Sequence, residues 1–107
     1  MVASEGHPGV LRCTSSTEDG RTVLALQGDI DLDTVALLDT WLEGARAEGG
    51  PVIVDLSGVD LLGSSGVASL LRAKRHGSIV VRRPSELVRK VLELSGVADL
   101  LESEPDR

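Results

Sequence analysis

Two adjacent serines between glycines are the residues of this sequence that are best placed to do chemistry. Ser64 and Ser65 lie in the run Gly63-Ser64-Ser65-Gly66, which directly follows an apolar segment. A serine hydroxyl can act as a nucleophile or help to bind the Mg²⁺ of a nucleotide, so three kinds of enzyme compete for this segment. The simplest interpretation is that one of the two serines caps a helix, which would stabilise that helix by about 1 kcal/mol.

The spacing of a nucleotide-binding P-loop is present, but its residue types are not. Gly58 and Gly63 have the separation of the P-loop glycines, and Ser65 has the position of the Mg²⁺-binding hydroxyl. Ser64, however, replaces the lysine that neutralises the β- and γ-phosphates. A hydrolase nucleophile elbow needs Gly-x-Ser-x-Gly, and Val67 occupies the last of these positions.

A catalytic Ser–His pair and a metal site are also disfavoured. His7 lies near the N-terminus, and His76 comes so far after Ser65 that about 16 Å would separate them along one helix. No calcium-loop spacing relates the aspartates that could bind a metal, namely Asp29, Asp31, Asp33, Asp55 and Asp60. The sequence therefore predicts a binding protein that is not an enzyme and needs no cofactor or metal.

The composition restricts the kinds of partner. The formal net charge of −6 argues against nucleic acid and anionic membranes. Trp41 is the only aromatic residue, so no surface of this chain can stack several bases. Cys13 is the only cysteine, which excludes an internal disulfide and suits a reducing cytoplasm. No apolar run is long enough to insert across a membrane, and no signal peptide is recognisable.

Short apolar segments predict the strands that position the serine pair. The segments Val10–Thr14 and Thr22–Gln27 are expected to form a hairpin through the turn at Asp19-Gly20. Val52–Leu56 has a β-branched interior that is typical of a central strand. A fourth strand is expected at Ser78–Val81, and a loop at Ser57–Gly63.

Helical spacing of apolar residues predicts three helices between and after these strands. The first follows Asp31 or Asp33 as its cap, and its apolar stripe consists of Val35, Leu38, Leu42 and Ala45, widened by Leu37 and Trp41. The second begins near Ser64 or Ser65 and ends at Gly77, and it appears short in the sequence. The third follows Pro84-Ser85 and is closed by Ser95-Gly96, and one last helical turn is expected within Val97–Leu101.

The expected order ββαβαβα predicts an α/β fold with a mixed, mostly parallel sheet, an N-terminal β-hairpin and packed helices. Strands joined through a helix are parallel neighbours with right-handed crossovers. One domain is expected over residues 10–101, with flexible tails at 1–9 and 102–107, because both ends are rich in polar residues, Gly and Pro.

Three motifs together resemble the STAS domain family, and in particular the bacterial anti-sigma factor antagonists. The run Val52–Val59 (VIVDLSGV), followed by Gly63–Val67 (GSSGV), resembles the signature of these domains. Gly28–Asp31 (GDID) resembles the acidic motif that ends their second strand, and Leu87–Val97 (LVRKVLELSGV) resembles their C-terminal helix. The likeness covers residues from about 10 to 101 and agrees with the predicted order of elements.

The resemblance implies a partner switch that regulates transcription. Such a protein binds an anti-sigma factor, which is often a serine kinase, and so frees a sigma factor. The kinase then phosphorylates a serine at the start of the second helix, and a serine phosphatase restores binding. By position the phosphorylated residue is Ser65, and the implied partner-binding residues are Asp29, Asp31, Asp60, Gly63, Ser64, Ser65, Gly66 and Val67.

One departure from the family pattern bears on the switch. The family usually has Asp immediately before the serine pair, whereas this chain has Gly63. The alternative function is therefore a STAS subunit of a lipid-transport or signalling complex that does not switch. A gene for a kinase anti-sigma factor or a sigma factor next to this one would favour the switch, and transporter genes would favour the alternative.

Overall fold

Strands and helices alternate along the chain in the order that the sequence predicts. The computed structural model describes residues 11–101; residue 10 and the predicted tails at 1–9 and 102–107 lie outside this range. The described elements are β1 (Leu11–Glu18), β2 (Arg21–Ile30), α1 (Val35–Ala47), β3 (Val52–Leu62), α2 (Ser64–His76), β4 (Ile79–Arg82), α3 (Glu86–Leu94) and the short 3₁₀ helix η1 (Ala98–Leu100).

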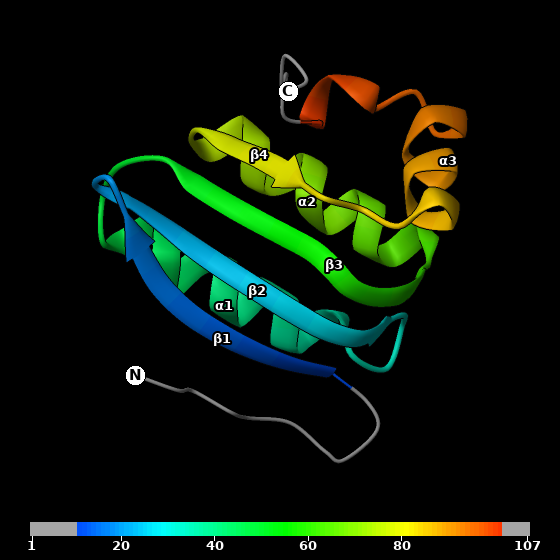
Figure 1. Cartoon of the computed structure of the whole chain (residues 1–107), viewed down its shortest axis with the longest axis horizontal. Coiled ribbons are helices and arrows are strands. Elements are labelled where there is room, and N and C mark those ends of the chain that lie inside the picture. Colours follow the sequence, from blue (N-terminus) through cyan, green and yellow to red (C-terminus); the bar gives the residue numbers. More distant parts are fainter. Residues whose placement is uncertain (1–10, 102–107) are drawn as a thin grey trace.

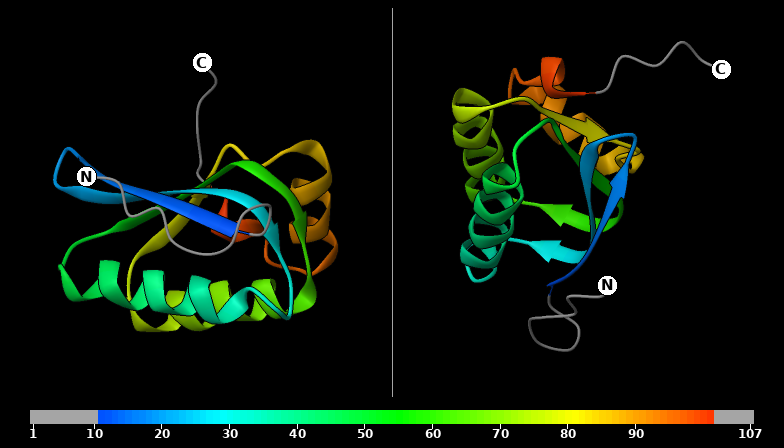
Figure 2. Two further views of the ribbon diagram at one scale, coloured as in Figure 1. Left: turned by 90° about the horizontal axis from the view of Figure 1, so that it is seen from below. Right: turned by 90° about the vertical axis from the view of Figure 1, so that its left-hand side faces the viewer.

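The four strands form one mixed sheet in the order β1-β2-β3-β4 (Figure 1). β1 pairs with β2 antiparallel, whereas β2, β3 and β4 are parallel to one another. The helices α1 and α2 lie side by side on one face of the sheet (Figure 2). α3 lies near the carboxyl end of β4 (Figure 1). This confirms the predicted fold class and the central position of β3.

The predicted hairpin turn at Asp19-Gly20 is confirmed, but the strands on either side are longer than expected. Both turn residues have positive φ, 53° and 79°, as a two-residue type I′ turn requires. β1 and β2 remain paired up to this turn, from Leu11 opposite Gly28 to Glu18 opposite Arg21. The polar residues from Ser15 onward suggested a connection, but they pair regularly with β2.

The loop predicted at Ser57–Gly63 is wrong, because β3 continues to Leu62. Register shifts against β2 accommodate the extra residues of β3, so its second half is bulged and still paired. The Asp55 side chain accepts the N–H of Ser57 at 2.9 Å, within the first irregular stretch. At Gly58 a Cβ atom would lie 2.9 Å from the Leu26 carbonyl oxygen, so this position needs glycine for close approach to β2.

The start of α1 differs from the predicted cap. Thr34 is the N-cap, and the carboxylate of Asp31 instead accepts the N–H groups of Asp33 and Thr34 at 2.9 and 3.1 Å. The prediction that Asp31 or Asp33 occupies the cap position is therefore wrong. Asp31 stabilises the turn that leads from β2 into the helix.

The starts predicted for α2 and α3 are confirmed. α2 begins at Ser64 and has 13 residues, the same length as α1, so the expectation of a short second helix is wrong. α3 has Ser85 as its N-cap, and the Ser85 hydroxyl accepts the Val88 N–H at 3.2 Å. Gly96, with φ of 76°, follows its last turn as predicted.

The core lies between the sheet and the helices and consists largely of aliphatic side chains. Its residues include Leu24, Leu26, Leu38, Val54, Leu56, Leu70, Val81, Val88 and Leu92. Cys13 belongs to this core, and its burial raises the pKa of its thiol to about 11. None of the helices described is long and apolar enough to cross a membrane.

A buried aspartate of β3 connects this central strand to the segment that follows the edge strand β4, on the face of the sheet away from α1 and α2. Asp55 lies on β3 and is 5% exposed, and the Arg83 guanidinium approaches its Oδ2 at 2.9 Å. Arg82 bonds at 2.9 Å to Glu18, although β1 and β4 are at opposite edges of the sheet. This contact requires the sheet to be coiled, so that the tip of the β1–β2 hairpin approaches β4 (Figure 2).

The charge of Asp55 should make the fold sensitive to acid. Burial alone would raise the pKa of this carboxyl, but hydrogen bonds from Ser57 and the charge of Arg83 outweigh it, so the pKa lies below its usual value of 3.8. A carboxyl whose pKa is lower in the folded state than in the unfolded state stabilises the fold at pH values above its unfolded-state pKa. This stability is lost as the pH falls through the folded-state pKa. The free energy of unfolding should therefore decrease as the pH drops below about 4.

Urea denaturation of Asp55→Asn over this pH range measures the effect. We expect a loss of roughly 1–3 kcal/mol at pH 7 and a weaker dependence on pH in acid. Asp60→Asn, an exposed position on the same strand, is the matched control and should follow the wild-type curve. An Asp55→Asn curve that runs parallel to wild type at every pH would contradict the assignment.

Candidate functional site

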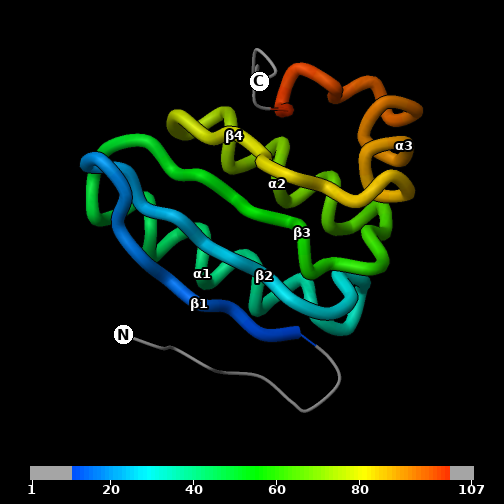
Figure 3. The backbone as a smooth tube through the Cα atoms, viewed as in Figure 1, coloured from blue at the N-terminus to red at the C-terminus, as the bar shows by residue number. Residues whose placement is uncertain are grey.

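The serine pair lies where the carboxyl ends of β2 and β3 meet the first turn of α2. Ile30 pairs with Leu62 in parallel register, and Gly63 then donates its N–H to the Ile30 carbonyl at 2.8 Å. α2 begins at the next residue, so β3 passes into the helix without a loop (Figure 3). The position of the serines is therefore fixed by two strands of the sheet.

Gly66 allows this first turn of α2 to pack closely against the sheet. A Cβ atom at this position would lie 2.5 Å from Cγ2 of Ile30 and 2.7 Å from Cδ1 of Leu62. These distances are too short for any larger residue unless the helix or these side chains move. Gly66 and Val67 are both buried, so they position the serine pair from inside the molecule.

Neither serine caps α2. The N-cap is Gly63, with φ of −84° and ψ of 174°, and its carbonyl accepts the N–H groups of Gly66 and Val67 at 3.0 and 3.1 Å. The expected capping by Ser64 or Ser65 is therefore wrong, and both hydroxyls are left for other contacts. Ser64 is exposed and Ser65 is half-buried. Both lie at the positive end of the helix dipole, where negative charge is favoured.

Acidic residues surround this end of the sheet. Asp29 is opposite Leu61 in the register, and its carbonyl accepts the Thr34 hydroxyl at 2.9 Å. Asp31 is held by the turn before α1, and the Cα of Asp31 would be 3.8 Å from a Cβ at Gly63. Asp60 is exposed near the end of β3. The predicted residues Asp29, Asp31 and Asp60 thus lie on the elements that meet at the serine pair.

Two exposed leucines belong to the same end of the sheet and were not predicted. Leu32 is 79% exposed in the turn after β2, and Leu61 is 45% exposed beside the end of β3. Single exposed leucines are common on any protein, and Leu87 and Leu94 of α3 are also exposed, but apolar side chains that lie together can form a surface that binds proteins. Leu61 gave no signal in the sequence, because it lies in the segment predicted as a loop, where side chains do not alternate regularly between two faces.

The geometry gives no support to a Ser–His pair. α2 runs unbroken from Ser64 to His76, so Ser65 and His76 are separated by about 16 Å along the helix axis, as the sequence predicts. The Nδ1 atom of His76 lies 2.8 Å from the Arg72 carbonyl, within its own helix. His7 lies outside the described residues. Within residues 11–101, no cluster of His, Cys, Asp and Glu has the arrangement of a metal site.

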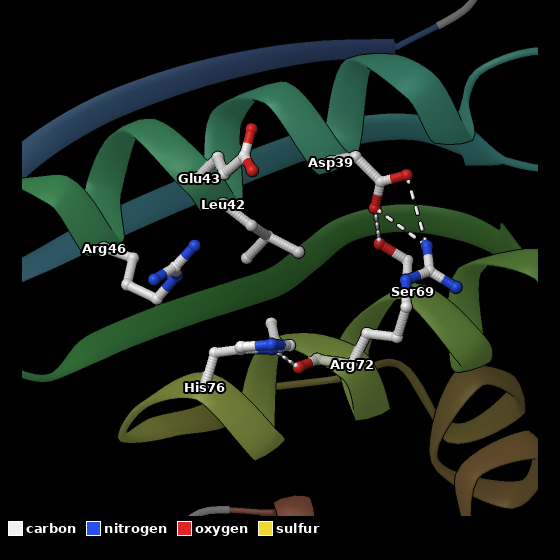
Figure 4. A pocket seen from close by; sticks show the side chains of 8 residues that line it. Asp39, Leu42, Glu43, Arg46, Ser69, Arg72 and His76 are labelled. Carbon is white, nitrogen blue, oxygen red and sulfur yellow. Dashed lines mark hydrogen bonds and ion pairs between the residues drawn. The ribbon is translucent and has the colours of Figure 1, made fainter.

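A groove of about 300 Å³ lies between α1 and α2, and its lining on α2 begins at Ser69, one helical turn after Ser65 (Figure 4). Asp39 of α1 accepts the buried Ser69 hydroxyl of α2, and both its carboxylate oxygens lie 3.3 Å from Arg72. The charges of Asp39 and Arg72 neutralise one another. These contacts join the two helices and require no ligand to complete them.

Comparisons with solved structures give the same architecture. An anti-sigma factor antagonist from Mycobacterium paratuberculosis superposes with a TM-score of 0.81 at 24% identity, covering 94% of this chain and 91% of that chain. The anti-sigma factor antagonist SpoIIAA in its unphosphorylated form gives 0.72 at 22% identity, covering 88% and 89% of the two chains. The Bacillus cell fate determinant SpoIIAA in the phosphorylated form gives 0.63 at 22% identity, covering 88% and 92%.

The sheet order, the helices and the strand-to-helix junction at the serine pair define a STAS domain. Residues 13–102 match the family described as "Mlab, STAS domain", and the chain belongs to this family. The resemblance to STAS domains inferred from the sequence motifs is thereby confirmed. The identities to the solved structures are low, so these likenesses establish the fold alone.

Gly66→Ala should destabilise the fold because the added methyl group meets Ile30 and Leu62. We expect a loss of about 1–3 kcal/mol in the free energy of unfolding, as for an overpacked core. Gly44→Ala is the matched control, because a Cβ at this α1 position meets nothing within 4 Å. It should gain roughly 0.5–1 kcal/mol. Equal effects of both substitutions in urea denaturation would contradict the close approach of α2.

Gly63→Asp should stabilise the domain. The backbone at Gly63 is extended, and a Cβ there would lie 3.5 Å from the Ile30 carbonyl oxygen, an ordinary contact distance. Asp is a better N-cap than Gly by a few tenths of a kcal/mol, and its negative charge interacts favourably with the positive end of the helix dipole. Gly63→Ala supplies no cap, so the order of unfolding midpoints should be Asp, Gly, Ala. Any other order would contradict the assignment of Gly63 as N-cap.

Proposed function

We propose that this chain is an anti-sigma factor antagonist that binds an anti-sigma factor and is released when Ser65 is phosphorylated. The observation that carries the proposal is the place of the serine pair, which opens α2 at an end of the sheet lined by acidic and exposed apolar groups. The solved structures compared above are anti-sigma factor antagonists, one of them in a phosphorylated form, which supports this kind of function.

The proposed contact surface consists of Asp29, Asp31, Leu32, Asp60, Leu61, Ser64 and Ser65. Leu32 and Leu61 would supply apolar area, and the aspartates would attract a basic partner surface. Gly63, Gly66 and Val67 belong to the site as the residues that hold the serines in place. The proposed partner is an anti-sigma factor with serine kinase activity, and a serine phosphatase would reset the complex in the cytoplasm.

Electrostatics account for a switch that leaves the fold intact. A phosphate on Ser65 would lie at the positive end of α2, which tolerates negative charge. It would add a charge of roughly −1.5 to −2 to a surface that already carries Asp29, Asp31 and Asp60. The added charge and its hydration would oppose docking of the partner without any need for refolding.

A second candidate function rests on Gly63, which stands where this family usually has Asp. A STAS subunit of a lipid-transport or signalling complex would use the same surface without phosphorylation. The backbone at Gly63 accommodates Asp, so the missing carboxylate can be restored and its effect on the kinase measured. This substitution distinguishes the two candidates.

The proposal predicts that kinase treatment adds one phosphate to wild type and none to Ser65→Ala. The experiment uses the anti-sigma factor kinase encoded nearest to this gene, with intact mass as the readout. Ser64→Ala is the matched control and should be phosphorylated like wild type. Gly63→Asp should be phosphorylated faster. Neither serine caps α2, so Ser65→Ala should change the free energy of unfolding by no more than about 0.5 kcal/mol.

Binding to the same protein provides the second readout. Ser65→Ala should bind and become insensitive to the kinase, whereas Ser65→Asp should bind more weakly by roughly 5- to 150-fold, equivalent to about 1–3 kcal/mol. Phosphate on Ser64 would overturn the assignment of the site. Tight binding that neither Ser65→Asp nor the kinase affects would overturn the switch and favour the second candidate.

A further inference from the structure

β1 is the edge strand at one side of the described sheet, and its backbone is regular. It has eight residues and pairs with β2 on one side, and within residues 11–101 no strand pairs with its other side (Figure 1). Its register with β2 is continuous from Leu11 to Glu18, without a bulge. Proteins usually protect such edges with proline, lysine, a bulge or a covering element. The described strand LRCTSSTE contains neither of these residues and no bulge.

The alternating hydrogen bonds of the β1–β2 ladder show which backbone N–H and carbonyl groups of β1 are not bonded to β2. Thr22 of β2 donates its N–H to Pro51, toward β3 and away from β1. Thr17 is opposite Thr22, so Thr17 also directs its N–H and carbonyl away from the β1–β2 ladder. Ser15 and Cys13 follow at two-residue intervals. Their peptide groups therefore point to the free edge and can pair with another strand.

The charges of the edge are complementary to a second copy of the same strand. When two copies pair antiparallel about Ser15, Arg12 of each lies opposite Glu18 of the other, and Thr14 lies opposite Ser16. These residues share the face away from the core and occupy the pairs without mutual hydrogen bonds, where side chains are closest. Shifting the register by two residues in either direction places no opposite charges together.

Both charged groups are available for this contact. Arg12 is exposed and makes no ion pair within the described part of the chain. Glu18 contacts Arg82 and Arg21 through Oε1 alone, at 2.9 and 3.7 Å. The second carboxylate oxygen of Glu18 has no such contact there and can accept an arginine from another copy.

We propose that two copies of this chain associate through β1, which extends the sheet across a two-fold axis at Ser15. The pairing forms one continuous sheet, with an Arg12–Glu18 ion pair on each side of the axis. It leaves the serine pair of each copy open, since α2 begins at the junction with β3, two strands away from this edge. The association does not depend on the function proposed above.

Sedimentation velocity of the full chain over a range of concentrations tests this surface. We expect wild type to shift toward the mass of a dimer as its concentration rises. Ser15→Pro removes only a free N–H and should give a monomer with an unchanged circular dichroism spectrum. Ser15→Ala keeps the N–H and is the matched control, which should dimerise like wild type.

Exchange of the charges tests the register. Arg12→Glu or Glu18→Arg alone should raise the dimer dissociation constant by about tenfold, and both changes together should restore it. A wild-type chain that stays monomeric at millimolar concentration would overturn the proposal. A dimer that survives Ser15→Pro would place the interface elsewhere, and failure of the double variant to recover would overturn the register.

Discussion

The close contact between the end of β2 and the first turn of α2 determines where the functional groups of this domain lie. The Gly63 N–H bonds to the Ile30 carbonyl at 2.8 Å, and Gly66 leaves room for the Ile30 and Leu62 side chains. A helix that begins directly at the end of a strand has no loop to absorb movement. The serine pair therefore keeps a fixed position relative to both strands, which the proposed recognition by a kinase and a binding partner would require.

The path of β3 explains why part of the fold could not be predicted. The sequence correctly indicates the order of elements, the hairpin turn and the start of α2, because each depends on local spacing and turn residues. Ser57 and Gly58 are typical turn residues and suggested a loop, yet they continue β3 through an irregular stretch. The Asp55 carboxylate accepts the Ser57 N–H, and Gly58 approaches the Leu26 carbonyl. The approach of Gly58 to Leu26 joins segments that are far apart in the sequence, so it leaves no local signal.

The same extension of β3 explains what was predicted and what was missed at the site. The motif correctly places the serine pair at the start of α2. Serine is preferred over glycine at the N-cap position of helices, and this preference led to the wrong prediction of the cap. Because β3 reaches Leu62, only Gly63 remains between strand and helix, so it becomes the N-cap. Leu32 was missed because an exposed leucine in a polar turn has no periodic pattern, and only the structure places it beside the acidic residues.

An NMR titration of the isotope-labelled chain with the kinase anti-sigma factor would test most directly whether partner binding and phosphorylation share this surface. We expect amide shifts at residues 29–33 and 60–65, the ends of β2 and β3 with the start of α2, and little change in β1 or in the groove between α1 and α2. Phosphorylation of Ser65 should abolish these shifts while the core resonances stay in place. Shifts centred on another face, or shifts that persist after Ser65 is phosphorylated, would contradict the proposed switch.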